Sequence, residues 1–337
     1  MTAGKERRAI SHMKTMNWKI RAIIPAVFAL LLSGISFGCA THRQDWQRVG
    51  DFGDMSQPTK ASMPGNQVRP RPEDPALQKA LPQMSAEDYE ASGDLYLGNK
   101  DYTMAFVQYE KSLGLQPDNP RIYYKQGLIF LYIGKHEDAV VSFQKVLEKE
   151  PRFAAAYEGM GTALFEMRRY DEAEKRFLKA VDLDPTLWKA RNYLGNIYDF
   201  QKNFDEAARE YAEAIRLRPD EGVLYNNLGV SLFLAGRYEE SINAFKQALW
   251  KKGPKERAYN NLGLVLAKTG RYDAALDAFM NGTGSARAYN NLGCVYLMQG
   301  EYPKAAYAFN KAIELSPKFY EKASENLKKI QLGASNN

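Results

Sequence analysis

Length and charge limit the classes of protein to which this chain can belong. Its 337 residues carry 46 Lys and Arg against 40 Asp and Glu, a formal net charge of +6. Six of the basic residues and one acid lie in residues 1–38, which leaves 40 basic and 39 acidic residues in the remainder. The positive charge therefore belongs to the N-terminal stretch, and it does not indicate a nucleic-acid-binding surface.

The N-terminal stretch has the order of a secretory signal. Basic residues run to Arg21, residues 22–32 are apolar, residues 33–38 are mostly small, and Cys39 follows. An apolar stretch of this length is short for a membrane span but suits the core of a signal peptide. The alternative is an uncleaved anchor, because residues 22–41 carry no charge.

This order resembles a bacterial lipoprotein signal, which implies that residues 1–38 are removed and that Cys39 becomes the lipidated N-terminus. Ser36 and Phe37 depart from the usual lipoprotein pattern. Ala40, directly after the lipidated residue, resembles the pattern that sorts lipoproteins to the outer membrane. The start sites Met1, Met13 and Met16 all remain open.

Residues 39–85 are predicted to form a tether. Prolines interrupt any helix in this segment, and its apolar residues show no periodicity. Such a composition favours a semi-extended, disordered chain, with a root-mean-square span on the order of 35–40 Å if it is flexible. The prolines are Pro58, Pro64, Pro70, Pro72, Pro75 and Pro82.

The rest of the chain repeats itself. Glycines stand at positions 93, 127, 161, 195, 229, 263 and 293, so that five successive gaps are 34 residues and the last is 30. The sequence Tyr-Asn-Asn-Leu-Gly ends at three of these glycines, Gly229, Gly263 and Gly293. A period of this length marks an architecture of stacked repeats, because one unit cannot bury its own apolar face.

Each unit reads as two helices, here named helix A and helix B. Apolar residues recur at spacings of three and four, which places them on one helical face. Gly134, Gly236, Gly270 and Gly300 lie between the two helices, where a left-handed residue ends helix A. Acidic pairs such as Asp171–Glu172 follow at the start of helix B, where the helix dipole favours them.

The pattern of Leu-Gly, Tyr, Ala, Phe and Pro over residues 86–319 resembles the tetratricopeptide repeat (TPR). The resemblance implies an all-α, right-handed α-solenoid of seven TPR helix pairs, followed by a capping helix and frayed tail over residues 320–337. The sixth repeat is four residues short, and we expect it to form a bend or joint. The repeats are 86–119, 120–153, 154–187, 188–221, 222–255, 256–285 and 286–319.

We find no catalytic constellation, so the chain is predicted not to be an enzyme. Its three histidines, His12, His42 and His136, have no metal-ligand spacing. The glycines occur at repeat spacing and form no phosphate-binding loop. Cys294 follows a repeat glycine and is expected to be a small buried residue. We therefore expect no cofactor, no metal, no nucleic acid and no small-molecule substrate.

The candidate binding residues are asparagines on helix A. The fold that the TPR resemblance implies places this part of helix A on a concave surface, and the residues directly before Leu-Gly resemble the asparagine ladder in the TPR superhelix of O-GlcNAc transferase. There the amides would bond an extended peptide backbone. The alternative is that they bond adjacent repeats to each other. The asparagines are Asn192, Asn196, Asn226, Asn227, Asn260, Asn261, Asn290 and Asn291.

Three basic residues at the second position of their repeats extend this candidate site. Lys189, Arg257 and Arg287 resemble the anion contacts of carboxylate-clamp TPRs. The alternative is that they are solvated surface charges.

Taken together, the leader and the repeats resemble the TPR lipoproteins of pilus assembly and secretion. The tight-adherence (Flp-type) pilus lipoprotein is the most similar, through its leader, its Asn-Asn-Leu-Gly repeats and its shortened late repeat. We expect a scaffold without enzymatic activity, lipid-anchored at the periplasmic face of a Gram-negative outer membrane, that binds a protein or peptide. An envelope adaptor that recruits peptidoglycan enzymes is the main alternative, and the TPR arm of a glycosyltransferase is a weaker one.

Overall fold

The computed structural model describes residues 84–316 and 320–334, and all of its regular elements there are helices. The predicted all-α architecture of tandem helix pairs is confirmed. The signal sequence, Cys39 and nearly all of the tether lie outside the described residues. The described residues form two compact units, which meet in the sequence between Asn119 and Pro120.

In the first unit the described residues form one helix pair, α2 (Ala86–Gly98) and α3 (Tyr102–Leu115). Ser85 caps α2 through a reciprocal bond with Asp88, so that two backbone N–H groups of the first turn are satisfied. The Ser112 hydroxyl donates to the Ala86 carbonyl over 2.8 Å and ties the end of α3 to the start of α2.

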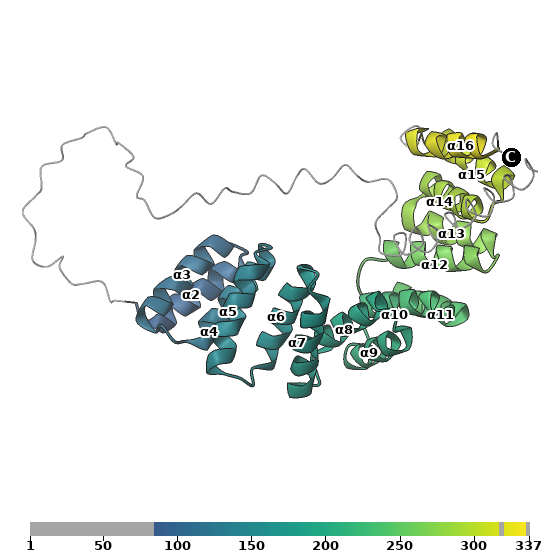
Figure 1. Ribbon diagram of the computed structural model, residues 1–337. Coiled ribbons are helices and arrows are strands. Elements are labelled where there is room, and N and C mark those ends of the chain that lie inside the picture. Colours follow the sequence, from purple (N-terminus) through teal and green to yellow (C-terminus); the bar gives the residue numbers. More distant parts are fainter. Residues whose placement is uncertain (1–83, 317–319, 335–337) are drawn as a thin grey trace, which may run out of the picture. The chain divides into compact units, whose positions relative to one another are not determined.

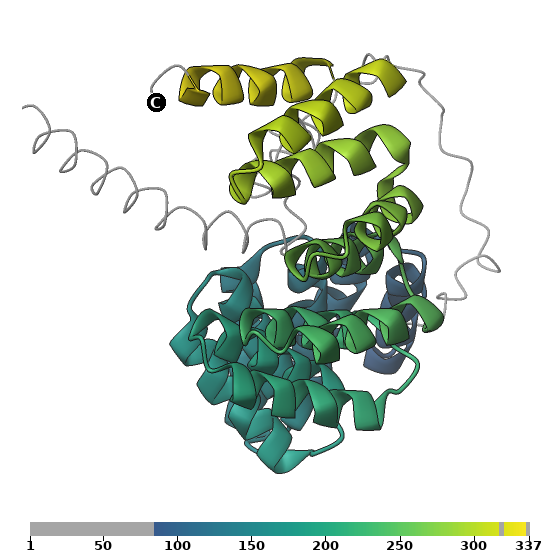
Figure 2. The same cartoon turned by 90° about the vertical axis from the view of Figure 1, so that its right-hand side faces the viewer.

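In the second unit six further helix pairs follow one another and a last helix closes the array. Each helix packs against its neighbours in the sequence, as Figures 1 and 2 show. The helices are α4 (Pro120–Tyr132), α5 (His136–Lys149), α6 (Ala154–Glu166), α7 (Tyr170–Leu183), α8 (Trp188–Phe200), α9 (Phe204–Leu217), α10 (Gly222–Leu234), α11 (Tyr238–Trp250), α12 (Glu256–Lys268), α13 (Tyr272–Thr283), α14 (Ser285–Met298), α15 (Tyr302–Leu315) and α16 (Tyr320–Ala334).

One contact builds every helix pair. The repeat glycine of helix A faces a fully buried aromatic ring of helix B, and a Cβ on Gly229 would lie 2.7 Å from the Phe245 ring. Each such ring removes its apolar surface from water, which stabilises the fold by about 1.5–3 kcal/mol. The predicted close approach of the two helices at this glycine is therefore confirmed. The seven rings are Tyr109, Phe143, Phe177, Tyr211, Phe245, Phe279 and Phe309.

A left-handed residue ends each helix A, as predicted for four glycines, which have φ between 75° and 80°. At Gly236 the backbone N–H groups of Gly236 and Arg237 donate to the carbonyl groups of Phe233 and Leu232. These are the two hydrogen bonds of a Schellman motif. In three other pairs the same place holds Lys100, Arg168 and Lys202, with φ of 60–64°.

The connections after α11 and α13 depart from the regular pattern. After α11 the backbone of Lys252 pairs with that of the strand-like segment before α10, donating to Asp220 and accepting from Gly222. After α13, which ends at Thr283, the single residue Gly284 with φ of 80° leads directly into α14. The short sixth repeat thus loses its whole loop, while the helix pair itself is kept.

Candidate functional site: the asparagine face of helices α8 to α14

The candidate site is the row of asparagines that precedes the repeat glycines on α8, α10, α12 and α14. Asn192, Asn226, Asn260 and Asn290 stand three residues before their glycine, and Asn227, Asn261 and Asn291 stand two residues before it. Because each helix A has the same orientation within its pair, equal sequence places become neighbours on successive helices.

Two direct bonds join asparagines of adjacent repeats. Asn227 Nδ2 donates to Asn192 Oδ1 over 2.9 Å, and Asn261 Nδ2 donates to Asn226 Oδ1 over 3.0 Å. In both cases the residue two before the glycine donates to the residue three before the glycine of the preceding repeat. The amides thus bond repeat to repeat, the alternative role that the sequence left open.

The third bond of this series is absent at the short sixth repeat. Asn260 Oδ1, which would be its acceptor, is buried and has no hydrogen-bond partner among the described residues. The backbone of Gly282 packs on it, since a Cβ there would lie 3.1 Å from that oxygen. Asn290 Oδ1 is likewise buried without a described partner. Leaving such an acceptor unsatisfied costs about 1–3 kcal/mol.

The asparagines differ in how much of the side chain a partner could reach. Asn261 is 3% exposed, and Asn290 is 8% exposed. Asn192 and Asn227 are half-buried. Their mutual bond leaves the Nδ2 group of Asn192 as a donor and the Oδ1 of Asn227 as an acceptor. This pair therefore presents one donor and one acceptor side by side.

Asn196 has a role inside its own repeat. It accepts a hydrogen bond of 2.7 Å from the Tyr211 hydroxyl, which also lies 2.9 Å from Asp199 Oδ2. Burial raises the pKa of Asp199 to about 6, although the hydroxyls of Ser231 and Tyr211 offset part of that rise. A carboxyl group that takes up a proton at about pH 6, instead of about pH 4, thus lies where α8, α9 and α10 meet.

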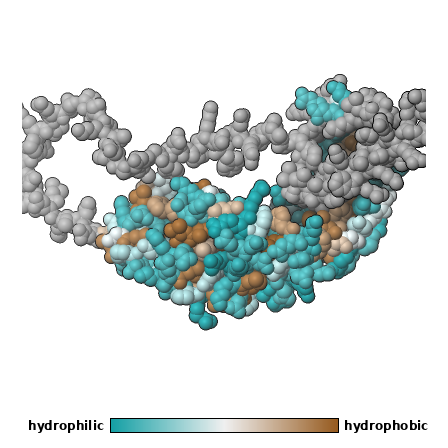
Figure 3. Space-filling view, in the orientation of Figure 1, coloured by the Kyte–Doolittle hydropathy of each residue, from teal (hydrophilic) through white to brown (hydrophobic). Residues whose placement is uncertain are grey.

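The three basic residues lie on the surface. Lys189, Arg257 and Arg287 are all exposed. The Lys189 ammonium lies 5.8 Å from the centroid of the Trp188 ring, a cation–π distance. Figure 3 shows one face of the molecule, where hydrophilic side chains surround separate apolar patches.

One residue of this row was missed from the sequence. Glu158 stands three residues before Gly161, the place that asparagine takes in the later repeats. Its Oε1 accepts from the Ala190 N–H over 3.1 Å, in the first turn of α8, where the helix dipole favours an anion. Burial raises the pKa of Glu158, and Lys189 opposes the rise. The sequence could have indicated this role, because Glu158 stands three residues before its repeat glycine, as Asn192 does in the next repeat.

The comparisons with known proteins agree on the family. Models described as the tetratricopeptide repeat match residues 89–119, the overlapping segments 124–187, 159–222, 194–257 and 227–283, and residues 286–319. These segments cover more than half of the chain. The chain is a tetratricopeptide repeat protein. Every matched model describes this repeat, and none describes an enzyme.

Solved structures show the same fold as this TPR protein. The C-terminal part of a TPR repeat-containing protein from Cytophaga hutchinsonii is 17% identical, covers 70% of this chain and 98% of its own, and has a TM-score of 0.55. A TPR protein from Parabacteroides merdae is 18% identical, with coverages of 73% and 98% and a TM-score of 0.53.

A third structure, the Cut9–Hcn1 hetero-tetramer of the APC/C, is 22% identical, with coverages of 76% of this chain and 50% of its own and a TM-score of 0.52. No curated protein matches the sequence. These likenesses establish the fold of the TPR protein.

Two further observations concern other kinds of site. The described residues contain no group of three or more His, Cys, Asp or Glu that could hold a metal ion. Within residues 84–316 and 320–334, every helix is too short or too polar to cross a membrane.

Proposed function

We propose that this TPR protein is a scaffold that binds an extended segment of a partner protein along its asparagine face. The observation that carries the proposal is the bonded pair Asn192 and Asn227, whose remaining amide donor and carbonyl acceptor take no part in that bond and have no other among the described residues. An extended peptide backbone offers the complementary acceptor and donor at every residue. Such binding makes little demand on the partner's sequence.

The exposed cations fit the same kind of partner. Lys189 stands at the start of α8, one helical turn before Asn192, and Arg257 and Arg287 hold the same place on α12 and α14. An acidic side chain or a C-terminal carboxylate on the partner would gain a charge-assisted hydrogen bond there. The two sets of residues together favour a peptide ligand with an acidic end.

The test is photo-crosslinking from the asparagine face in living cells. A photoreactive residue replaces the exposed Val223, which stands one helical turn before Asn226 and leaves the asparagine pair intact, and mass spectrometry identifies the crosslinked segment. We expect an extended segment of a partner protein, lost when Asn227 is replaced by Ala because the neighbouring acceptor is removed. The exposed Lys179 on α7, a helix B that carries none of the asparagines, is the control position and should give no such product. Equal products from both positions would reject the asparagine face.

We further propose that Cys39 is lipidated and anchors this scaffold at the periplasmic face of the outer membrane, in pilus assembly or secretion. The support is the order of the leader, with basic residues, an apolar run, small residues and then cysteine, and its resemblance to the tight-adherence pilus lipoproteins. Labelled palmitate should enter the wild-type protein and not Cys39→Ser. A mature chain that begins upstream of Cys39 would contradict the anchor.

The pathway follows from the identity of the crosslinked partner. A pilus or secretion component would support the proposed role. A peptidoglycan enzyme in its place would support the adaptor alternative, and in that case the peptide-binding face would stand while its assignment to pilus assembly would fall.

A further inference from the structure

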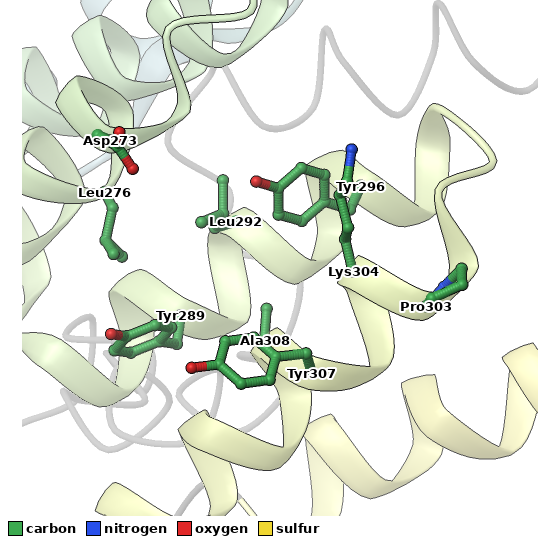
Figure 4. Close-up of a pocket in the computed structure, with 9 residues that line it drawn as sticks. All are labelled: Asp273, Leu276, Tyr289, Leu292, Tyr296, Pro303, Lys304, Tyr307 and Ala308. Atoms are coloured by element: carbon green, nitrogen blue, oxygen red, sulfur yellow. The ribbon is translucent and has the colours of Figure 1, made fainter.

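A pocket on the last two helix pairs lies apart from the asparagine bonds. It has a volume of about 410 Å³ and lies between α13, α14 and α15. Figure 4 shows the rings of Tyr289, Tyr296 and Tyr307 facing a common space, with Leu276 and Asp273 opposite them on α13. Pockets of 300–1,000 Å³ with apolar walls and a few polar groups are the usual size and character of ligand sites.

The seventh helix pair departs from the other repeats at the residues that line this pocket. The third to fifth pairs begin helix B with two acids, such as Glu239–Glu240, whereas α15 has Pro303–Lys304 at those places. Where α15 has Tyr307, the preceding four repeats have Lys175, Arg209, Asn243 and Asp277. Three departures on one helix therefore line one pocket.

Packing of the fold does not account for Tyr307. Its side chain is 62% exposed, whereas the aromatic ring that holds the pair together, Phe309, is fully buried. Large exposed aromatic residues at the edge of a pocket are typical of binding surfaces, because they lose little conformational entropy on binding.

Two charged side chains line the pocket, Asp273 and Lys304. Lys304 lies 3.2 Å from Glu301, the N-cap residue of α15, so that its charge is matched. Lys311, which interacts with Tyr307 and Tyr289, is likewise paired with Glu314. Asp273 lines the pocket, and Asp277 follows one helical turn later; both side chains are exposed. Arg271, the nearest basic residue before Asp273, is paired with Glu239. A ligand with a positive charge would therefore complement this edge.

We propose that this pocket binds an extended, proline-containing segment of a partner protein that carries arginine or lysine beside the proline. Grooves lined by tyrosine and other aromatic rings hold proline-rich segments, which are stiff before binding and lose little entropy. The three tyrosine rings would pack against the proline ring, and Asp273 would face the basic side chain. The site differs from the asparagine face, so it does not depend on the proposed function.

The first test measures binding of a defined probe by titration calorimetry with the full chain. The probe is a synthetic peptide that copies residues 66–72, Asn-Gln-Val-Arg-Pro-Arg-Pro, and its control has both prolines replaced by alanine. We expect binding in the range of about 10–500 µM, as is common for small, weakly buried contacts. Tyr307→Ala and Tyr289→Ala should each lower the affinity roughly tenfold or more, since aromatic anchors dominate such contacts.

Two variants sharpen the result. Asp273→Asn should lower the affinity about threefold and reduce its dependence on salt, because a surface charge pair is screened. Trp250→Ala removes an aromatic side chain that is 85% exposed and does not line the pocket. It should leave binding unchanged. Thermal melting of each variant verifies that it is folded. Absence of binding at 1 mM probe, or equal loss in Trp250→Ala, would overturn the proposal.

The second test identifies the natural occupant. A photoreactive residue in place of Tyr307 is crosslinked in cells, with the same residue in place of Trp250 as the control. A crosslinked segment with proline next to a basic residue supports the proposal. Crosslinks to helical segments, to acidic segments or to segments without proline would overturn it.

Discussion

Two junctions of the array, between the fifth and sixth helix pairs and between the sixth and seventh, share their packing and differ in their hydrogen bonds. At both, helix B of one pair packs on helix A of the next, α11 on α12 and α13 on α14. At the first junction Asn261 bonds to Asn226, and at the second the corresponding acceptor, Asn260, has no described partner.

The difference follows from the length of the repeat. Asn261 and Asn226 are 35 residues apart, whereas Asn291 and Asn260 are 31 residues apart. Apolar contacts are not directional, so α13 and α14 still pack after four residues are lost. A hydrogen bond requires its donor–acceptor distance to stay within a few tenths of an ångström of about 2.9 Å, so it is lost first. Three of the four predictions, taken in order of expected effect, test this comparison, and the one at Asp199 adds the contact between the fourth and fifth repeats.

The largest effect should come from removing the ring that packs on the repeat glycine inside the pair before each junction. Phe245→Ala and Phe279→Ala each leave a cavity beside a repeat glycine and should lower the free energy of unfolding by about 3–5 kcal/mol. Urea unfolding of both variants measures this loss. A loss at Phe279 below half of that at Phe245 would show that the short sixth pair is packed less tightly than the fifth, and the two pairs would then differ in packing as well.

The second prediction concerns Asp199 and the dependence of the free energy of unfolding on pH. The pKa of Asp199 is about 6 in the folded protein and near 3.8 in the unfolded chain. The folded state thus binds the proton more tightly, and this stabilisation, complete below pH 4, is lost as the pH rises through 6. Asp199→Asn should remove this dependence and raise stability at pH 7.5 by on the order of 1–3 kcal/mol.

The measurement for Asp199 is urea unfolding at pH 5 and at pH 7.5. The wild type should lose stability between the two values, relative to Asp199→Asn. Parallel curves for the two proteins would show that this carboxyl group is ionised in the folded state throughout, and that its burial between the fourth and fifth repeats has no effect on pH stability.

A matched pair of asparagine variants tests the hydrogen bond itself. Asn226→Ala leaves the buried Asn261 amide without its acceptor and should cost about 1–3 kcal/mol. Asn260→Ala removes an acceptor that has no described partner, and alanine is the better helix former, so stability should rise by about 0.5–1 kcal/mol. Unfolding of both in urea should therefore give shifts of opposite sign. Two shifts of the same sign would contradict the difference between the junctions.

The smallest effect concerns local opening. The connection after α11 is held by backbone bonds of Lys252 to Asp220 and of Gly222 to Lys252, whereas Gly284 alone follows α13. Hydrogen exchange should be faster over residues 280–285 than over 250–255, because fewer bonds must break to open that segment. Equal protection of the two connections would show that the short repeat is not a joint.

The local design of each repeat could be predicted from the sequence. Gly229, Phe245 and Gly236 occupy places that recur along the chain, and each has a local requirement: close approach, a large ring and a left-handed turn. The spacing of such residues carries this information. Lys100, Arg168 and Lys202 adopt the left-handed conformation without a glycine, because the helices on either side hold the turn.

The candidate site could be predicted in part. The row of asparagines was recognised, but its sequence left two roles open, since an amide serves a partner or a neighbouring repeat equally well. The bond lengths at Asn227 and Asn261 assign their amides to neighbouring repeats. Binding of a partner by the remaining donor and acceptor stays a prediction.

Sequence alone determined the number of helix pairs, their period and the residues that pack inside each pair, because these depend on contacts between residues close along the chain. Only the tertiary structure decided which amide bonds to which, that Glu158 accepts from the first turn of α8, and that Tyr289, Tyr296 and Tyr307 line one pocket. These contacts join side chains of different helices, most of them in different repeats. Their distances depend on how the helices are placed relative to one another. A period in the sequence sets the order of the helices, and small shifts in their packing set which polar atoms meet.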